Sequence, residues 1–79
     1  MDKSFLELLE AERKEIYNLK YSKEDALEYH KRSENADGTE KEAYERLAYN
    51  FEKSAKEAEE KLLLIRKEMK KYISFIEAL

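Results

Sequence analysis

The chain has 79 residues, of which 44% are charged, and its 16 Lys and Arg residues nearly balance its 19 Asp and Glu residues, for a net charge of −3. This balance argues against a polyanionic ligand, and the absence of cysteine excludes both a disulfide scaffold and a zinc–cysteine module. We expect residues 1–79 to form one domain, which is too short to bury much surface and therefore needs a partner for stability.

Hydrophobic residues make up 42% of the chain, and their helical periodicity argues against disorder. The longest apolar run is the four residues 62–65, which is far shorter than a membrane span or the core of a signal peptide. We therefore expect a soluble, cytoplasmic protein.

The first predicted helix covers residues 4–34. Ser4 and Glu7 form a capping box at its start, with Asp2 as an alternative start one turn earlier. A break near Ser22 would give three helices, but possible ion pairs four residues apart on both sides favour one continuous helix. Its best apolar seam contains polar interruptions and consists of Phe5, Leu9, Glu12, Ile16, Leu19, Lys23, Ala26 and His30.

Tyr17 and Tyr21 lie one turn apart on the side opposite this seam. This spacing predicts an aromatic pair that faces away from the second helix. Two interpretations stay open for the pair: a protein interface, or two amphipathic side chains that lie along neighbouring lysine stems.

A turn is predicted at residues 35–38, because Gly38 is the only glycine and the chain has no proline. Lys31 and Arg32 precede the turn, where cations suit the end of a helix. Thr39 and Glu42 form a possible capping box for the helix that follows.

The second predicted helix covers residues 39–79 and has an apolar residue at every heptad a and d position from Tyr44 onwards. The a residues are Ala48, Ala55, Leu62, Met69 and Ile76, and the d residues are Tyr44, Phe51, Ala58, Ile65, Tyr72 and Leu79. The fold class is therefore all-α, an antiparallel helical hairpin with a longer C-terminal helix. At 1.5 Å per residue the helices are roughly 45 and 60 Å long, so residues beyond about 70 should overhang. The expected neighbours are Tyr29 with Tyr44, Tyr21 with Phe51, and Phe5 with Glu68 and Met69.

The second helix is too apolar for an isolated hairpin. Leu63 and Leu64 lie outside its seam, and Ile73 and Phe75 widen the apolar stripe near the C-terminus. Two hairpins that pack as a four-helix bundle would cover these residues, so we expect a homodimer. The N-terminal cluster of Phe5, Leu6, Leu8 and Leu9 is well placed to provide part of this cover. A parallel coiled coil through the second helix alone is less favoured, because its alanine-rich seam is thin.

No catalytic residue, cofactor site or metal site is predicted. His30 is the only histidine, and Leu27 stands where a Glu-x-x-His metal motif would need glutamate. A single glycine also excludes a glycine-rich phosphate loop. We expect His30 to be a partly exposed capping or packing residue.

These observations predict a non-enzymatic protein–protein interaction module, a small helical adaptor or inhibitor of the kind that phages and mobile elements encode as short chains. Its expected partners are a second copy of the chain and an unidentified target protein. The candidate binding residues are Leu63, Leu64, Tyr72, Ile73, Phe75, Ile76, Tyr17 and Tyr21.

Two alternatives use the basic residues that precede the apolar C-terminus, namely Lys61, Arg66, Lys67, Lys70 and Lys71. One is peripheral binding to a membrane surface, and the other is nucleic-acid binding by a helical hairpin. Neither is favoured. The apolar residues already continue the seam, and the acidic chain makes a poor track for phosphates.

Overall fold

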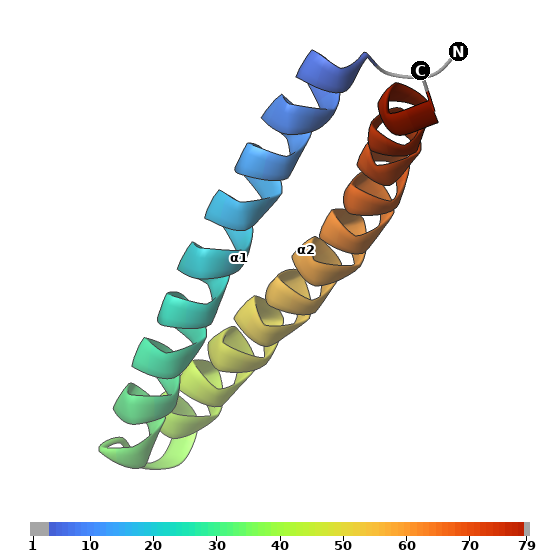
Figure 1. Cartoon of the computed structure of the whole chain (residues 1–79). Coiled ribbons are helices and arrows are strands. Elements are labelled where there is room, and N and C mark those ends of the chain that lie inside the picture. The colour runs from blue at the N-terminus through green and yellow to red at the C-terminus, as the bar shows by residue number, and fades with distance from the viewer. Residues whose placement is uncertain (1–3, 79) are drawn as a thin grey trace.

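The computed structural model describes residues 4–78 and consists of two antiparallel helices joined by a short turn (Figure 1). Helix α1 spans Phe5–Glu34 and helix α2 spans Gly38–Ala78. The all-α helical hairpin predicted from the sequence is confirmed. Helix α1 runs through Ser22 without interruption, so the three-helix alternative is wrong. Asp2, the alternative helix start, and Leu79, the last predicted d residue, lie outside the described residues.

Helix α1 begins after Ser4, which adopts an extended backbone conformation. The Ser4 hydroxyl accepts a hydrogen bond from the backbone N–H of Glu7 at 3.2 Å, and this bond satisfies one of the free donors in the first turn. Lys31 and Arg32 occupy the last turn, where their charges complement the helix dipole. The predicted cap at Ser4 is therefore confirmed.

The turn contains residues 35–37. It is stabilised by two hydrogen bonds that Asn35 donates and by the conformation of Gly38. The Asn35 backbone N–H donates to the Arg32 carbonyl at 3.2 Å, and its side-chain amide donates to the Lys31 carbonyl at 3.1 Å. Gly38 has a φ of +59°, a conformation that L-residues with a side chain rarely adopt. Because α2 begins at Gly38, Thr39 lies inside its first turn, and the predicted capping box of Thr39 with Glu42 is wrong.

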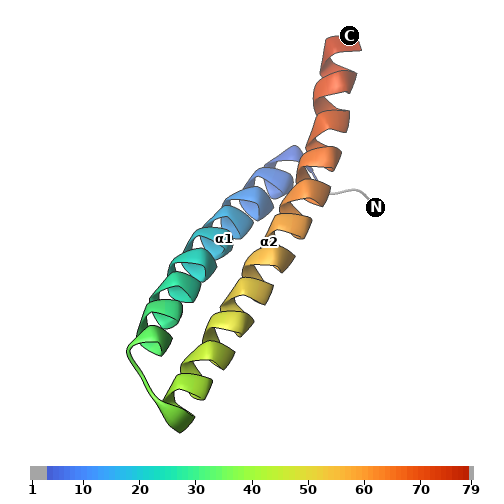
Figure 2. The same ribbon diagram turned by 90° about the horizontal axis from the view of Figure 1, so that it is seen from below.

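Helix α2 packs on α1 through the heptad seam predicted for it. Its fully buried residues are Ala48, Ala55, Ala58 and Leu62. The d residues from Tyr44 to Tyr72 are half-buried or buried along the same line. Among the a residues, Met69 is half-buried and Ile76, the last one, is exposed. Ile76 is exposed because α2 extends beyond the start of α1, as Figure 2 shows. The predicted overhang is therefore present.

The seam of α1 differs from the predicted one in half of its positions. The buried and half-buried residues of α1 contain a heptad series, namely Phe5, Leu8, Glu12, Glu15, Leu19, Ser22, Ala26, Tyr29 and Ser33. Ala11 and Asp25 are half-buried beside this series. The prediction was right for Phe5 and the residues that follow it at intervals of seven. It was wrong for Leu9, Ile16, Lys23 and His30, because the true second column lies one residue earlier and these four side chains flank the seam instead.

Aromatic side chains fix the register between the helices. Tyr29 stacks on Tyr44 with ring centroids 6.0 Å apart, as predicted. Phe51 also stacks on Tyr29, at 5.6 Å with nearly parallel rings, and not on Tyr21 as predicted. At the other end Phe5 packs on Tyr72 with ring centroids 5.8 Å apart, and Tyr72 lies three residues, about one helical turn, beyond the expected Met69. Tyr29 contacts two aromatic residues of α2, one on each side of it along that helix. Each residue of α1 therefore lies opposite a residue of α2 that is closer to the C-terminus than the sequence predicted.

Candidate protein interaction surface

Two grooves follow the line of contact between the helices, one on each side of the hairpin. The first groove defines the Lys23 side and is lined by Lys23, Ala26, Leu27, His30, Glu52, Ala55, Lys56 and Glu59. The second defines the Tyr21 side and is lined by Glu15, Asn18, Tyr21, Ser22, Asp25, Ser54, Glu57, Ala58 and Lys61. Residues separated by multiples of seven share a side of such a hairpin. A residue that lies one or more heptads from a groove residue is therefore assigned to the same side as that groove.

Side-chain contacts between basic and acidic residues of the two helices concentrate on the Lys23 side. The Lys23 Nζ lies 3.2 Å from the Glu59 Oε1, and the His30 imidazole contacts the Glu52 carboxylate. Both members of each pair are about half exposed, so each contact contributes at most roughly 1 kcal/mol. Their main consequence is geometric. They fix the position of Lys23 and His30 of α1 along the hairpin relative to Glu59 and Glu52 of α2.

The open end of the hairpin is where α1 begins and α2 ends. Towards this end, the heptad positions that Lys23 and Glu59 occupy are taken by apolar residues. Ile16 and Leu9 lie one and two heptads before Lys23, and Ile73 lies two heptads after Glu59. We call the exposed set the open-end patch, which consists of Leu6, Leu9, Ile16, Leu63, Ile73 and Ile76. Each member is a multiple of seven residues from a residue of the Lys23 groove. The patch therefore gathers side chains from both helices on one side of the hairpin.

Basic residues accompany this patch. Arg66 lies in the same column of α2 as Ile73, and its Nε donates to the Glu12 carboxylate at 3.0 Å. This ion pair joins the two helices beside the apolar residues: the Arg66 side chain is about half exposed, and the Glu12 carboxylate belongs to the α1 seam. Arg13 and Lys70 are exposed one heptad from Leu6 and Leu63, respectively. The patch is therefore apolar with cationic neighbours.

The same side carries two more exposed apolar residues in its turn half. Leu27 lines the Lys23 groove, and Tyr49 lies seven residues before Lys56. Both side chains are largely exposed. The Lys23 side thus presents apolar residues at both of its ends, with charged pairs between them.

The sequence-predicted binding residues divide between the two sides. Leu63, Ile73 and Ile76 belong to the open-end patch. Leu64 lies seven residues after Glu57, and Phe75 lies two heptads after Lys61, so both belong to the Tyr21 side. The structure therefore separates residues that the sequence placed in one C-terminal cluster.

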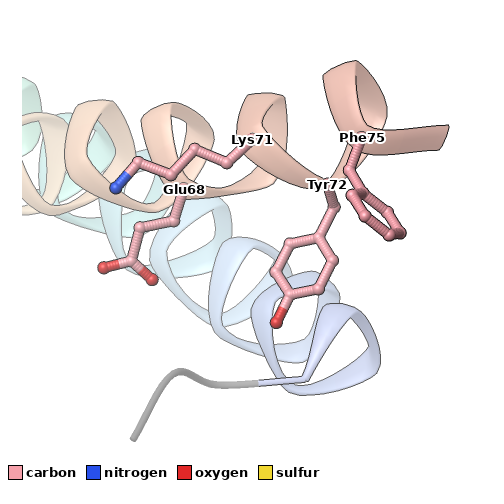
Figure 3. Close-up of a pocket in the computed structure, with 4 residues that line it drawn as sticks. All are labelled: Glu68, Lys71, Tyr72 and Phe75. Atoms are coloured by element: carbon pink, nitrogen blue, oxygen red, sulfur yellow. The ribbon is translucent and has the colours of Figure 1, made fainter. Parts of the chain in front are cut away.

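Tyr72 is the most enclosed of the predicted binding residues, because it packs on Phe5 at the start of α1. Figure 3 shows its ring directed at the first turns of α1, with Phe75 farther along α2. Glu68, Lys71, Tyr72 and Phe75 line a shallow groove at this end. Tyr72 therefore closes the open end of the hairpin core, whereas Phe75 is exposed.

Tyr17 and Tyr21 form the aromatic pair predicted from their spacing, with ring centroids 4.3 Å apart. Tyr17 is exposed on the outer face of α1, whereas Tyr21 borders the second groove near α2. The Lys20 ammonium lies 5.8 Å from the centre of the Tyr21 ring, a distance compatible with a cation–π contact. The prediction that the pair faces away from α2 is therefore wrong for Tyr21, while both interpretations of the pair remain consistent with the geometry.

Sequence reasoning missed three residues of the Lys23 side as candidate contacts, namely Ile16, Leu27 and Tyr49, whereas Leu6 and Leu9 belong to the N-terminal cluster that it expected to cover part of the dimer. Leu9 and Ile16 had been assigned to the core because they are more apolar than the true core residues Glu15 and Ser22. The missing signal was the strict heptad that begins at Phe5, which matches the heptad of α2 and excludes Leu9 and Ile16 from the seam.

Comparisons of the chain with protein-family models, with curated proteins and with solved structures find no match. Within residues 4–78, no helix has a segment long and apolar enough to cross a membrane. The same residues contain no group of three or more His, Asp or Glu side chains that could hold a metal ion. The functional proposal therefore rests on the exposed apolar surface.

Proposed function

We propose that the chain is a non-enzymatic protein–protein interaction module, a small helical adaptor or inhibitor that dimerises into a four-helix bundle and binds a target protein through an apolar helix face. The observation that carries this proposal is the open-end patch, in which six large aliphatic side chains from two helices are exposed on one side. Scattered exposed apolar residues are ordinary, but a group of this size on one side of a hairpin is typical of a contact surface.

The size of the patch supports the proposal. An aliphatic side chain at these exposures presents on the order of 100 Å² to water, so six present roughly 600 Å². This value is at the upper end of what monomeric proteins expose in one patch. At about 25 cal/mol per Å², covering it would release on the order of 15 kcal/mol before the entropic costs of association.

The hairpin core supports dimerisation for a complementary reason. Ala48, Ala55 and Ala58 fill much of the seam of α2, and Leu8 is the largest side chain that is fully buried. Alanine buries little apolar surface, so an isolated hairpin gains little stability from this core. A second hairpin would add a second layer of buried aliphatic residues and complete a four-helix bundle.

Light scattering on the purified chain tests the proposal. We expect a mass twice the 9.5 kDa of one chain at micromolar concentration. The double variant Phe75→Glu with Ile76→Glu should be a monomer or unfold, because it places two charges at the exposed end of α2. The matched control, Asn50→Glu with Ser74→Glu, adds the same charge at exposed polar positions and should stay dimeric. A folded wild-type monomer at high micromolar concentration would contradict the proposal.

A further inference from the structure

We infer that the second copy of the chain packs on the Lys23 side, patch on patch, with the turns of both hairpins at the same end of the bundle. This inference rests on the proposed function and makes it specific. It assigns the open-end patch to self-association and leaves the Tyr21 side and the outer face of α1 for the target protein.

The distribution of exposed residues distinguishes the two sides. On the Lys23 side, the contact of Lys23 with Glu59, continued by two heptads, places Leu9 of α1 opposite Ile73 of α2. On the Tyr21 side, Leu47, Leu64 and Phe75 come from α2, and Tyr21 is the one large exposed apolar residue that the described part of α1 contributes. Glu68 and Lys71 lie between Leu64 and Phe75. The counterpart column of α1 on that side contains Asn18 and Asp25. Among the described residues, the Lys23 side therefore offers exposed aliphatic residues from both helices, whereas α1 contributes only the amphipathic Tyr21 to the Tyr21 side.

The area of the Lys23 side matches what a specific interface needs. The six residues of the open-end patch, together with Leu27 and Tyr49, present on the order of 800 Å² of apolar surface. Two copies would bury roughly 1,600 Å² in total, which is the standard size of a stable protein–protein interface. A two-fold dimer uses the same face on both copies, so the interface must be self-complementary.

The positions of the charged pairs determine the orientation. With the turns at the same end, the open-end patch of one copy faces that of the other, and Leu27 and Tyr49 of both copies meet in the turn half. Reversing one hairpin along its full length would place the patch over Lys23, His30 and their glutamate partners. That arrangement would bury charged groups against aliphatic side chains, which is unfavourable.

Two neighbouring leucines of α2 provide a matched test. Leu63 and Leu64 are 70% and 65% exposed, but Leu63 lies on the Lys23 side and Leu64 on the Tyr21 side. In analytical ultracentrifugation, Leu63→Glu should raise the dimer dissociation constant more than about 100-fold, because two aliphatic contacts are lost and a carboxylate is desolvated. Leu64→Glu should change it by less than about threefold.

Two neighbouring residues of α1 provide a second matched test. They show whether α1 as well as α2 contributes to the dimer interface on the Lys23 side. Ile16, which is 45% exposed, belongs to the patch, whereas Tyr17, which is 61% exposed, lies on the outer face. Ile16→Glu should dissociate the dimer, and Tyr17→Glu should not. Circular dichroism at a concentration above the dissociation constant of each variant should show native helicity for all four, since each substitution changes an exposed position.

The outcomes separate this inference from the proposed function. A wild-type monomer would overturn both. A wild-type dimer that survives Leu63→Glu and Ile16→Glu would overturn the inference while the dimeric module stands. Equal dissociation by both members of each pair, or dissociation by Leu64→Glu and Tyr17→Glu alone, would also overturn the assignment to the Lys23 side.

Discussion

Leu8 and Leu9 are neighbours in the sequence and differ in what surrounds them. Leu8 is fully buried against α2, whereas Leu9 is 41% exposed on the flank of the seam. Apolar character alone does not separate the two, because both are leucine. The separation follows from the heptad, in which Leu8 and Tyr29 share a column with Glu15 and Ser22.

Truncating each leucine therefore tests the α1 seam. Leu8→Ala should lower the free energy of unfolding by about 2–4 kcal/mol, because it removes a buried side chain and leaves a cavity. In the Leu63→Glu background, which removes the dimer contacts of Leu9, Leu9→Ala should lower it by less than about 1 kcal/mol. Urea unfolding should be followed at one fixed protein concentration, since the stability of a dimer depends on it. A larger loss for Leu9→Ala would restore the seam predicted from the sequence.

Glu15 shows how a charged residue occupies a core position. Its residue surface is only 8% exposed, and among the described residues no cation lies within ion-pair distance of its carboxylate. The residue also lines the groove on the Tyr21 side, so its aliphatic stem packs in the seam while the carboxylate reaches the groove. No side-chain polar atom among the described residues is both buried and without a hydrogen-bond partner.

At the scale of elements, the turn depends on the backbone of one residue. Gly38 starts α2 at a φ of +59°, and a Cβ built there would meet no heavy atom within 4 Å. A side chain at this position is therefore disfavoured by conformation and not by packing. The distinction leads to a prediction about which substitutions the turn tolerates.

Gly38→Ala should destabilise the hairpin by about 1 kcal/mol, because alanine disfavours positive φ. Gly38→Asn should lose less, since asparagine adopts the left-handed conformation more readily. Thermal unfolding at fixed concentration measures both variants. Equal stability of Gly38→Ala and wild type would show that the turn can form without a left-handed residue.

The two helices were not equally predictable, and the reason is physical. Helix α2 has apolar residues at all its seam positions, so periodicity alone identified the face that contacts α1. Helix α1 has Glu12, Glu15 and Ser22 at seam positions, and more apolar residues lie beside them. Its seam is determined by what it packs against, above all the stacking of Tyr29 on Tyr44 and Phe51. The position of the α1 seam therefore follows from contacts between the two helices and cannot be read from the segment of either helix alone.

This difference also explains which part of the candidate site escaped prediction. Leu63, Leu64 and the C-terminal residues stood out because they exceed what one seam requires. Leu9 and Ile16 had appeared to be core residues, and only their displacement from the seam turns them into surface. The open-end patch is therefore a property of the hairpin, since half of it comes from a helix whose exposed face depends on the partner helix.

For the whole molecule, elongation limits how much surface the hairpin can bury by itself. It measures 62 × 19 × 15 Å, so it is only two helices wide and one helix thick. Every residue outside the single line of contact faces water. A second layer on the Lys23 side would double the thickness and turn a single seam into a four-helix core, while the Tyr21 side of each copy would remain available to a target.

The orientation of the two hairpins can be measured with spin labels, because the chain has no native cysteine. We expect single labels at Asp37→Cys, in the turn, to lie within roughly 40 Å of each other in the dimer, because packed helices are about 8–10 Å apart. Labels at Ser74→Cys, near the open end, should be similarly close. Both sites are exposed, and neither belongs to the open-end patch.

Two other distance patterns would contradict this orientation. Reversing one hairpin along its full length would separate the turn labels by about the 62 Å length of the molecule. A dimer that overlaps only at its open ends would keep the Ser74→Cys labels close and place the turn labels still farther apart. In that case Leu27 and Tyr49 would stay uncovered, and the interface would shrink to roughly 1,200 Å², the lower bound for a specific complex. The turn-to-turn distance therefore decides whether the whole Lys23 side or only its open half forms the interface.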